Sequence, residues 1–460
     1  MVPVYKNNMV KNHGSVLIMS MILIVVCTAI AVSMASISSA NIQLASNHRN
    51  VDLALASAES GLEIQRYWLT PVSMPSSTPP ADYYSAIINA VKYDLDANSI
   101  SNVILNTDGS INPVTVESPT SQTFTGQISP DPNNLTILHV YSTGGNGQVT
   151  RTIKVDFDIE PYKHPIFNYG LATKGPLSFT GNPTMTGINT NWEADMYIES
   201  SSDLTAVTVG GNLNFAGDIE IGNPSATVDF GGDVLIAGEH GVPAVDNHVT
   251  IGAEPVDFPA PDTDMFRKYA TGDTIDASTD LNAYTNILVN CSIAPNTNPV
   301  FPKSVIIQGI LFIESPNIVT FTRNIALQGI IVGDGDLNDP GTNRIDILGN
   351  FASGPYPDGE EFDAIRSEVG SSMLAPGFTV TFQGNFSTLE GVVAVSGVHF
   401  SGNVNAIIKG TIINYSETPM QIDGNAVMNF DRLSSTKIPA GFDTLRVLTY
   451  KPSSYEEISL

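Results

Sequence analysis

The densest group of oxygen-bearing side chains in the sequence lies in the polar stretch 333–344, GDGDLNDPGTNR. Asp-x-Asp-x-Asn is how a calcium-binding loop begins, and the candidate ligands are Asp334, Asp336, Asn338 and Asp339. A complete EF-hand loop also needs Gly at its sixth position and Glu at its twelfth, where this sequence has Asp339 and Ile345. An EF-hand is therefore excluded. Calcium stays a candidate only for a looser site, and the alternative is a solvated surface turn.

A second chemistry to consider is cleavage of polysaccharides, which needs paired carboxylates, or carboxylates with Arg or Lys, on one face. The candidate acids are Asp218, Glu220 and Asp229, and the candidate bases are Lys303, Arg323 and Lys409. They form no recognisable motif, and the sequence has no Gly-x-Ser-x-Gly turn, phosphate-binding loop or dinucleotide fingerprint. We therefore expect no catalytic residues and no cofactor, and hence a protein that is not an enzyme.

These candidate residues belong to a repetitive region in which short apolar runs alternate with Gly-Asn or Gly-Asp turns. The repeats are Phe179-Thr-Gly-Asn182, Val209-Gly-Gly-Asn212, Ile347-Leu-Gly-Asn350, Phe382-Gln-Gly-Asn385, Phe400-Ser-Gly-Asn403 and Ile422-Asp-Gly-Asn425. In addition, Gln308-Gly309-Ile310 recurs 20 residues later as Gln328-Gly329-Ile330. A period near 20 residues with short strands predicts a parallel β-helix over residues 164–435, whose apolar residues stack from coil to coil. A flat sandwich is the alternative.

Gly and Asn suit the corners of such coils, where a positive φ is often required. The Gly-Asn coils resemble those of bactofilin-like, polymer-forming β-helices. Residues 254–269, 333–344 and 355–367 interrupt the register, and we expect the first of these segments to pack on or beside the solenoid. The non-repetitive residues 436–460 are predicted to form a C-terminal cap or tail.

Ahead of the repeats, residues 69–163 predict an α+β domain. Residues 81–95 have apolar positions at helical spacing, and strands follow them. The strongest hairpin signal is Gly144-Gly145-Asn146-Gly147, which lies between two stretches of alternating polar and apolar residues. A helix followed by antiparallel strands is typical of the α+β class.

Charge is distributed unevenly along the chain. The 460 residues include 46 acidic and 20 basic side chains, a net charge of −26, which argues against a nucleic-acid partner. No carboxylate precedes Asp52, and Val16 to Ile37 is an uncharged apolar run. As a helix this run of 22 residues would be about 33 Å long, enough to span the roughly 30 Å of a bilayer core. Lys6 and Lys11 precede it and favour a cytoplasmic N-terminus.

Three processing routes are open for this segment. A signal peptide could be cleaved near Ser38-Ser39-Ala40, although its apolar stretch would be unusually long. A lipoprotein signal is disfavoured because Val26, not a small residue, precedes Cys27. Cleavage after Gly14 would instead keep the apolar helix. Residues 41–68 favour this route, because their helical spacing and lack of proline continue the apolar run into one long helix.

Two stretches of this helix resemble the N-terminus of PilX-type minor pilins: His13-Gly14-Ser15-Val16-Leu17-Ile18 and Ala58-Glu59-Ser60-Gly61-Leu62-Glu63. The resemblance covers roughly residues 11–68. It implies a prepilin leader over residues 1–14, cleavage between Gly14 and Ser15, and a pilin-like helix over residues 15–68. It also implies a prepilin peptidase, other pilins and the pilus assembly platform as partners, with the long helix packed inside a filament.

One position departs from the pattern of the major pilins, which carry Glu at the fifth mature residue. Counted from Ser15, that residue is Met19. The departure favours a minor, tip or initiating subunit over a bulk subunit. An ordinary membrane anchor that never polymerises is the alternative.

Taken together, the sequence predicts a mainly β protein with a long N-terminal α-helix, an α+β pilin-like head and a parallel β-helix. We expect a structural minor pilin-like protein of a type IV pilus or related secretion filament. It would cross the inner membrane once, with its body in the periplasm or displayed outside the cell. The second hypothesis is an exported protein on the same kind of anchor that binds or cleaves surface glycan.

Overall fold

The computed structural model describes residues 13–117, 122–146, 149–201, 204–401, 404–433 and 438–458. The chain divides into two compact units. The first comprises Met1–Glu160 together with Arg446–Leu460, and the second comprises Pro161–Leu445. Each unit has its own hydrophobic core.

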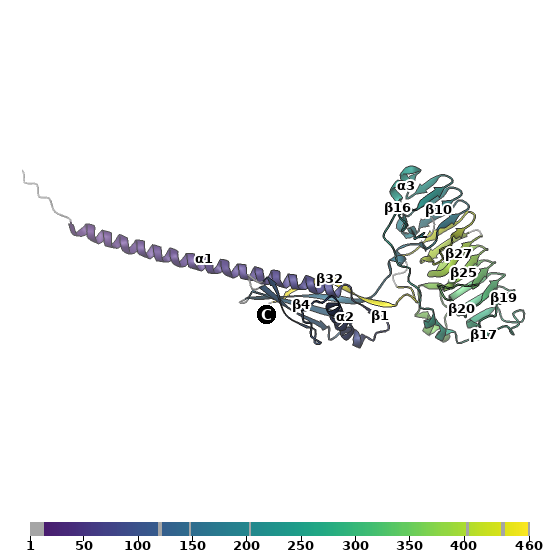
Figure 1. Cartoon of the computed structure of the whole chain (residues 1–460), viewed down its shortest axis with the longest axis horizontal. Helices are drawn as coiled ribbons and strands as arrows, with labels where there is room; N and C mark the ends of the chain where they lie inside the picture. Colours follow the sequence, from purple (N-terminus) through teal and green to yellow (C-terminus); the bar gives the residue numbers. More distant parts are fainter. Residues whose placement is uncertain are drawn as a thin grey trace, which may run out of the picture. The chain divides into compact units, whose positions relative to one another are not determined.

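The first unit begins with α1 (His13–Leu69), an uninterrupted helix of 57 residues that is drawn in purple in Figure 1. At 1.5 Å per residue it is about 85 Å long. It contains no proline, and Pro71 follows just beyond its end. Its first part is exposed, whereas Ala54, Ala58 and Leu62 are buried in the core of the unit.

Behind the buried part of α1 lies a six-stranded sheet in the order β1-β32-β5-β4-β3-β2. The strands are β1 (Ser73–Pro75), β2 (Ser110–Glu117), β3 (Gln122–Pro130), β4 (Ile137–Gly145), β5 (Thr150–Pro161) and β32 (Leu445–Ile458). A second helix, α2 (Tyr83–Ala97), contributes Ile87, Val91 and Leu95 to the same core. The predicted hairpin is present as β4 and β5, which pair antiparallel from Ile137↔Asp158 to Gly145↔Thr150.

The prediction of a C-terminal cap over residues 436–460 is wrong for the last strand. β32 is not part of the solenoid and instead lies between β1 and β5 in the sheet of the first unit. Its partners confirm the placement, because Ser454 Oγ accepts a hydrogen bond from the Asp156 N–H (2.7 Å) and Lys451 pairs with Asp158 (3.3 Å). The solenoid is therefore inserted into the sheet, between two neighbouring strands.

The second unit consists of short strands that form a β-solenoid of about 12 turns, which confirms the predicted fold class. Most strands pair in parallel with the strand one coil away, as in β20 with β22 from Val305↔Ile325 to Ile313↔Gly333. The strands of the first half are β6 (Leu171–Thr173), β7 (Leu177–Phe179), β8 (Thr184–Gly187), β9 (Met196–Ile198), β10 (Thr205–Val209), β11 (Leu213–Phe215), β12 (Ile219–Ile221), β13 (Thr227–Phe230), β14 (Val234–Ile236), β15 (Glu239–His240) and β16 (Val249–Ile251).

The second half has longer strands. They are β17 (Thr274–Ile275), β18 (Ile287–Ile293), β19 (Val300–Phe301), β20 (Val305–Ile313), β21 (Ile318–Phe321), β22 (Ile325–Gly333), β23 (Arg344–Ile347), β24 (Phe351–Gly354), β25 (Ser371–Phe382), β26 (Phe386–Glu390), β27 (Val392–Phe400), β28 (Val404–Lys409), β29 (Ile412–Asn414), β30 (Met420–Ile422) and β31 (Val427–Phe430).

The coils do not stack in simple chain order. The last coil (β29, β30 and β31) pairs with the first coil (β6, β7 and β8), so the chain builds the solenoid in two runs that meet in the middle. Figure 1 shows this arrangement within the unit, where the yellow-green strands β25 and β27 lie between teal β10 and green β20. As a consequence the unit begins and ends close together, and the Tyr162 N–H donates to the Leu445 carbonyl (2.9 Å).

Apolar ladders fill the interior of the solenoid. One ladder passes through both runs without interruption: Ile219, Met196, Leu171, Ile412, Val393, Met373, Ile331, Leu311 and Cys291. A second contains stacked aromatic rings, with the centroids of Phe382 and Phe400 lying 5.1 Å apart. These buried ladders carry the hydrophobic stabilisation of the fold.

The Gly-Asn repeats form a corner ladder in which the expected positive φ is present at Gly424 (φ 75°) and absent at Gly181. Asn212 N–H donates to Asn182 Oδ1 (2.9 Å), and Asn182 N–H donates in turn to Asn425 Oδ1 (3.3 Å). A Cβ added to Gly181 would lie 2.2 Å from the Gly424 carbonyl oxygen, although Gly181 itself has no positive φ. Close stacking of the backbone, not backbone conformation, therefore requires glycine there.

The excursion 254–269 packs on the solenoid as expected, and it connects the two runs. Tyr415 Oη donates to the Pro259 carbonyl (2.5 Å), and Phe266 is fully buried against one outer face of the coils. Both ends of the solenoid are covered as well. Helix α3 (Val242–His248) buries Ala244 at one end, and Tyr284 packs on the core at the other.

Candidate functional site

The most unusual surface of the chain is the first part of α1. Its large apolar side chains are exposed from Val16 to Leu44, with Met19 75% and Val25 65% accessible. Among the described residues, this is the one helix long and apolar enough to cross a membrane, with a mean hydropathy of 2.8. Within this stretch, polar side chains hydrogen-bond to the helix itself: Ser20 Oγ donates to the Leu17 carbonyl and Thr28 Oγ1 to the Ile24 carbonyl. Such a surface suits lipid or other apolar helices.

The predicted cleavage site and the fifth mature residue lie at the start of this helix. Residues 1–12 of the predicted leader fall outside the described residues, while Gly14 and Ser15 lie within α1. Met19, in place of an acidic residue, projects into the surroundings as one more apolar side chain. The predicted span 16–37 lies wholly inside the exposed apolar part of α1.

The second part of α1 packs closely on the sheet because small residues lie at the contact. A Cβ added to Gly61 would lie 2.5 Å from the Phe124 ring and from Ser142 Oγ, so a larger residue there would collide with β3 and β4. Conversely, a Cβ on Gly144 of β4 would lie 2.1 Å from the Ala54 carbonyl oxygen. Gly61, a residue of the recognised Ala-Glu-Ser-Gly-Leu-Glu stretch, therefore permits close packing of helix on sheet.

Two buried polar side chains fix the position of the helix along the sheet. Gln65 Nε2 donates to the Tyr141 carbonyl (3.3 Å), and Ser57 Oγ donates to Gln122 Oε1 (3.1 Å). Both Gln65 and Ser57 are completely buried. Breaking a hydrogen bond in such a water-free environment costs much free energy, so these bonds favour one position of the helix along the sheet.

Glu59, the other residue singled out in that stretch, contacts the C-terminal strand. A hydrogen bond joins Glu59 to Tyr455, whose pKa is raised by burial and by the Glu59 and Glu457 carboxylates. Next to it the Arg66 guanidinium lies 4.6 Å from the centre of the Tyr450 ring. Nothing in the local sequence signalled these contacts, because the partners lie almost 400 positions apart along the chain.

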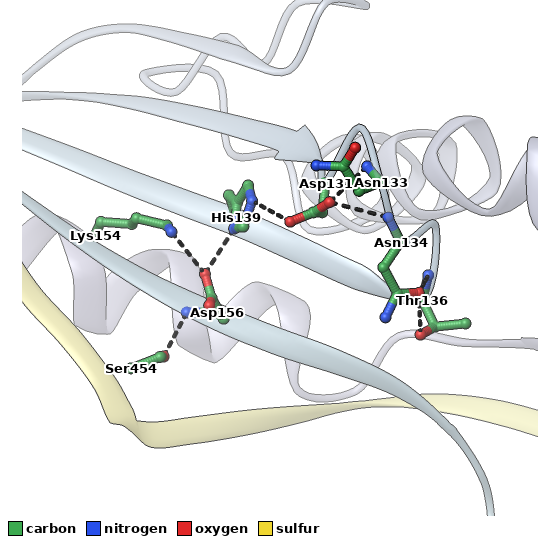
Figure 2. A network of polar contacts seen from close by, with 8 residues as sticks. All are labelled: Asp131, Asn133, Asn134, Thr136, His139, Lys154, Asp156 and Ser454. Atoms are coloured by element: carbon green, nitrogen blue, oxygen red, sulfur yellow. Dashed lines mark hydrogen bonds and ion pairs between the residues drawn. The ribbon is translucent and has the colours of Figure 1, made fainter.

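A polar network on β4 and β5 secures the same strand (Figure 2). His139 Nδ1 lies 2.7 Å from Asp156 Oδ1, and His139 Nε2 lies 3.1 Å from Asp131 Oδ2. Asp156 also pairs with Lys154 (3.4 Å), and its backbone N–H donates to Ser454 Oγ. The pKa of Asp131 is lowered by hydrogen bonds from the Asn133 and Asn134 backbone. This network is structural, since it joins β4, β5 and β32.

The four candidate calcium ligands are engaged by the protein itself or lie in a turn. Asp334 Oδ2 accepts from Arg267 (2.7 Å) and its Oδ1 accepts from the Ser315 N–H (2.6 Å). Asp336 Oδ1 accepts from the Asn338 N–H (2.8 Å), which forms a local turn that also includes Asp339. Within the described ranges, no three His, Cys, Asp or Glu residues are arranged to hold a metal ion.

The structure brings two of the candidate acids together and adds a third. Asp218 directly precedes β12 and Glu220 lies within it, and the Asp218 N–H donates to Asp195 Oδ1 (2.9 Å). Burial and the Asp218 carboxylate raise the pKa of Asp195 to about 6. Asp229 lies on β13 in a separate ladder. The candidate bases Lys303, Arg323 and Lys409 belong to coils of the other run, so among the described residues none of them pairs with Asp218, Glu220 or Asp229. Lys409 pairs instead with Glu390 (2.9 Å).

The comparisons with known proteins concern the helix first. Residues 13–63 match the family model described as PilX N-terminal, so the N-terminal region of this chain is pilin-like. Among solved structures, the chain is similar to the competence-associated pilin ComZ from Thermus thermophilus, with 11% sequence identity and a TM-score of 0.31. That alignment covers 89% of this chain and 97% of the other. No match is found among the curated proteins.

The match to the family model supports a role related to type IV pili, and the apolar part of α1 is suited to anchoring the chain in a membrane by a single pass. The matched residues 13–63 include the exposed apolar part of the helix and the first part of the segment that packs on the sheet, including Gly61. No comparison bears on the resemblance of the solenoid to bactofilins.

Proposed function

We propose that this chain is a minor pilin-like subunit that carries the β-solenoid into, or displays it on, a type IV pilus or related secretion filament. One observation carries the proposal: the pilin-like helix leaves its whole apolar first part uncovered by its own chain. In this proposal the inner-membrane lipid covers that surface before assembly. The apolar helices of other pilins then replace the lipid within the filament.

The position of the solenoid in the sequence supports display. The 285-residue segment 161–445 leaves the sheet after β5 and returns directly into β32, its neighbour in the sheet. An inserted segment whose two ends lie close together disturbs the fold of the domain that carries it least. We therefore propose a structural rather than an enzymatic role, in which the first unit is the assembly module and the solenoid is what it presents.

Met19 favours a low-copy subunit. A fifth mature residue without a carboxylate removes the charge that would attract a neighbour's N-terminal amine. The size of the solenoid argues in the same direction, since it would crowd a filament in which every subunit carried one. We place the subunit at the tip or at the initiation of the filament, assembled through the platform after a prepilin peptidase has removed the leader.

N-terminal sequencing of the mature chain from its native membrane tests the first step. We expect a mature N-terminus at Ser15 in cells with the peptidase and an intact leader in cells without it. A start at Asn41 would indicate an ordinary signal peptide and would contradict the proposal, because it removes the helix on which assembly depends. A second readout is the presence of the chain in the sheared filament fraction.

A further inference from the structure

A cavity of about 720 Å³ lies in the first unit, between the end of α1 and the end of α2. Its lining comes from residues 63–71 and 94–100, all of which belong to that unit. The volume is within the range of roughly 300 to 1,000 Å³ that is typical of ligand sites. We call this cavity the helix-end pocket.

The helix-end pocket has an apolar floor and a polar rim. Trp68 and Leu95 line it and are only 8% and 4% exposed, so they form the floor. Tyr67 lines it from α1 and is 78% exposed, and Asp94 and Asn98 line it from the end of α2. Such a pocket can hold the apolar stem of a long side chain and the charged group at its end at the same time.

Two helix ends make the potential in the helix-end pocket negative. α1 ends at Leu69 and α2 ends at Ala97, and residues from the last turn of each helix line the pocket. The carbonyl groups at the C-terminal end of a helix carry a partial negative charge of about half an elementary charge. Two such ends at one pocket favour a cation over an anion.

The charged side chains of the lining agree with this sign. They are two carboxylates, Glu63 and Asp94, and one guanidinium, Arg66, a net charge of −1. Arg66 is already engaged, because it pairs with Glu63 (3.5 Å) and lies over the Tyr450 ring. Asp94, in contrast, forms no ion pair with any residue in the described part of the chain. Its carboxylate is therefore available to a cation from outside.

We propose that the helix-end pocket binds a lysine or arginine side chain of a partner protein. The stem of that side chain packs on Trp68 and Leu95, and its charged end pairs with Asp94 beside Tyr67, whose ring face attracts a cation. The net charge of −26 on the chain draws a basic partner towards it. A neutral sugar would use the tyrosine ring but would gain nothing from the two helix ends.

The test follows the fluorescence of Trp68 in the purified full chain in detergent micelles. A Trp192→Phe background leaves Trp68 as the single tryptophan. The probes are acetyl-Gly-X-Gly-amide peptides, in which X is arginine, lysine, citrulline or glutamate, and the neutral sugar maltotriose. We expect a saturable change with the arginine and lysine peptides that weakens with added salt. The citrulline peptide, which has nearly the shape of the arginine peptide without its charge, should bind at least tenfold more weakly.

Three variants locate the site. Asp94→Asn should weaken binding of the arginine peptide about tenfold, the effect of losing one charge-assisted contact. Arg66→Gln should strengthen it about threefold, because it removes the one cation of the lining. The matched control is Asp96→Asn, which removes a carboxylate from the same last turn of α2 but outside the lining. Its effect should be within about twofold, because solvent and salt screen a more distant charge. Circular dichroism checks that each variant is folded.

The proposal is overturned if neither cationic peptide binds, if the citrulline or glutamate peptide binds as well as the arginine peptide, or if only maltotriose binds. Equal losses in Asp94→Asn and Asp96→Asn would overturn it too, since a general charge effect would then explain the binding. Weaker binding by a folded Arg66→Gln variant would have the same consequence. The proposal does not rest on the pilin role, and none of these results bears on cleavage before Ser15.

Discussion

The solenoid and the first part of α1 handle apolar surface in opposite ways. The solenoid covers most of its own: ladders fill the interior, the segment 254–269 covers an outer face, and α3 and Tyr284 pack on the core at its two ends. The helix leaves everything from Val16 to Leu44 exposed. The solenoid therefore buries its apolar core by itself, whereas the helix needs lipid or other chains around it.

Introducing a charge on the helix should have the largest effect. Val25→Asp places a carboxylate in the centre of the apolar stretch, where it costs about 2.5 to 3.5 kcal/mol of insertion free energy and has no partner in a bundle of helices. We expect a strong loss of the chain from the carbonate-washed membrane fraction and its absence from sheared filaments, both measured by immunoblot.

The matched control is Val242→Asp, which makes the same change at a 71% exposed valine of α3. It should leave membrane retention and filament content unchanged. Equal behaviour of Val25→Asp and Val242→Asp would refute the distinction between an incomplete helix and a self-contained solenoid.

Within the solenoid, removing one interior ring should be the most damaging single change. Phe382 is 2% exposed, and its ring centroid lies 4.9 Å from that of Phe386 and 5.1 Å from that of Phe400. Phe382→Ala should lower the free energy of unfolding of this unit by about 3 to 5 kcal/mol. Urea titration followed by the fluorescence of Trp192 would measure it in a Trp68→Phe background.

Ile407→Ala, at a 40% exposed position of β28, is the control for Phe382→Ala. Its expected cost is within about 0.5 kcal/mol. A loss as large as that of Phe382→Ala would mean that the outer faces, and not the interior ladders, hold the coils together.

How much of the fold could be predicted from the sequence depends on how far apart along the chain the interacting residues lie. The helix and the coils are local features: an apolar run without charges, and Gly-Asn turns at a period near 20 residues. The pairing of Gln308 with Gln328 follows directly from that period. The meeting of the first and last coils, as in Leu171 with Ile412, does not, because all coils have similar inward residues and no local pattern selects one neighbour.

The placement of β32 was missed for the same reason. Its burial pattern is irregular, with only Leu448 buried, so it carries no clear period-2 signal. Its partners lie far away in the sequence, such as Asp156 and Asp158 on β5 and Arg66 on α1. Of the candidate sites, Gly61 was found through its motif, whereas Asp195 was missed because the raised pKa comes from tertiary burial.

At the junction between exposed helix and head, enlarging Gly61 should have an intermediate effect. In Gly61→Ala the new methyl group meets the Phe124 ring and Ser142 Oγ at 2.5 Å. The gain of about 1 kcal/mol in helix propensity is outweighed by an overpacking cost of about 1 to 3 kcal/mol. We expect a lower melting temperature of the first unit, followed by Trp68 fluorescence.

Ser60→Ala, one position earlier on a less buried side of α1, tests propensity without the clash and should be neutral or slightly stabilising. If Gly61→Ala stabilised the unit to the same degree, the close approach of helix and sheet would not be the reason for this glycine.

The smallest effect concerns two carboxylates of the solenoid that differ in pKa. Burial raises the pKa of Glu193, but N–H bonds from Leu433, Asn189 and Thr190 outweigh it and lower the pKa to about 2. The pKa of Asp195 is raised to about 6, chiefly by burial. Glu193 therefore stabilises the fold above about pH 4.5, an effect lost as the pH falls towards 2, whereas Asp195 costs stability as the pH rises from about 4 through 6.

Asp195→Asn should accordingly stabilise the solenoid by about 1 to 2 kcal/mol at pH 7.5 and leave it nearly unchanged at pH 4, because the amide oxygen can still accept from the Asp218 N–H. Urea titrations at the two pH values would measure the difference. Glu193→Gln is the opposite case and should destabilise at pH 7.5, since an NH₂ group would face several N–H donors. If Asp195→Asn raised the free energy of unfolding equally at both pH values, burial of the ionised carboxylate would carry no cost. The solenoid would then tolerate a charge at this position as well as on its exposed faces.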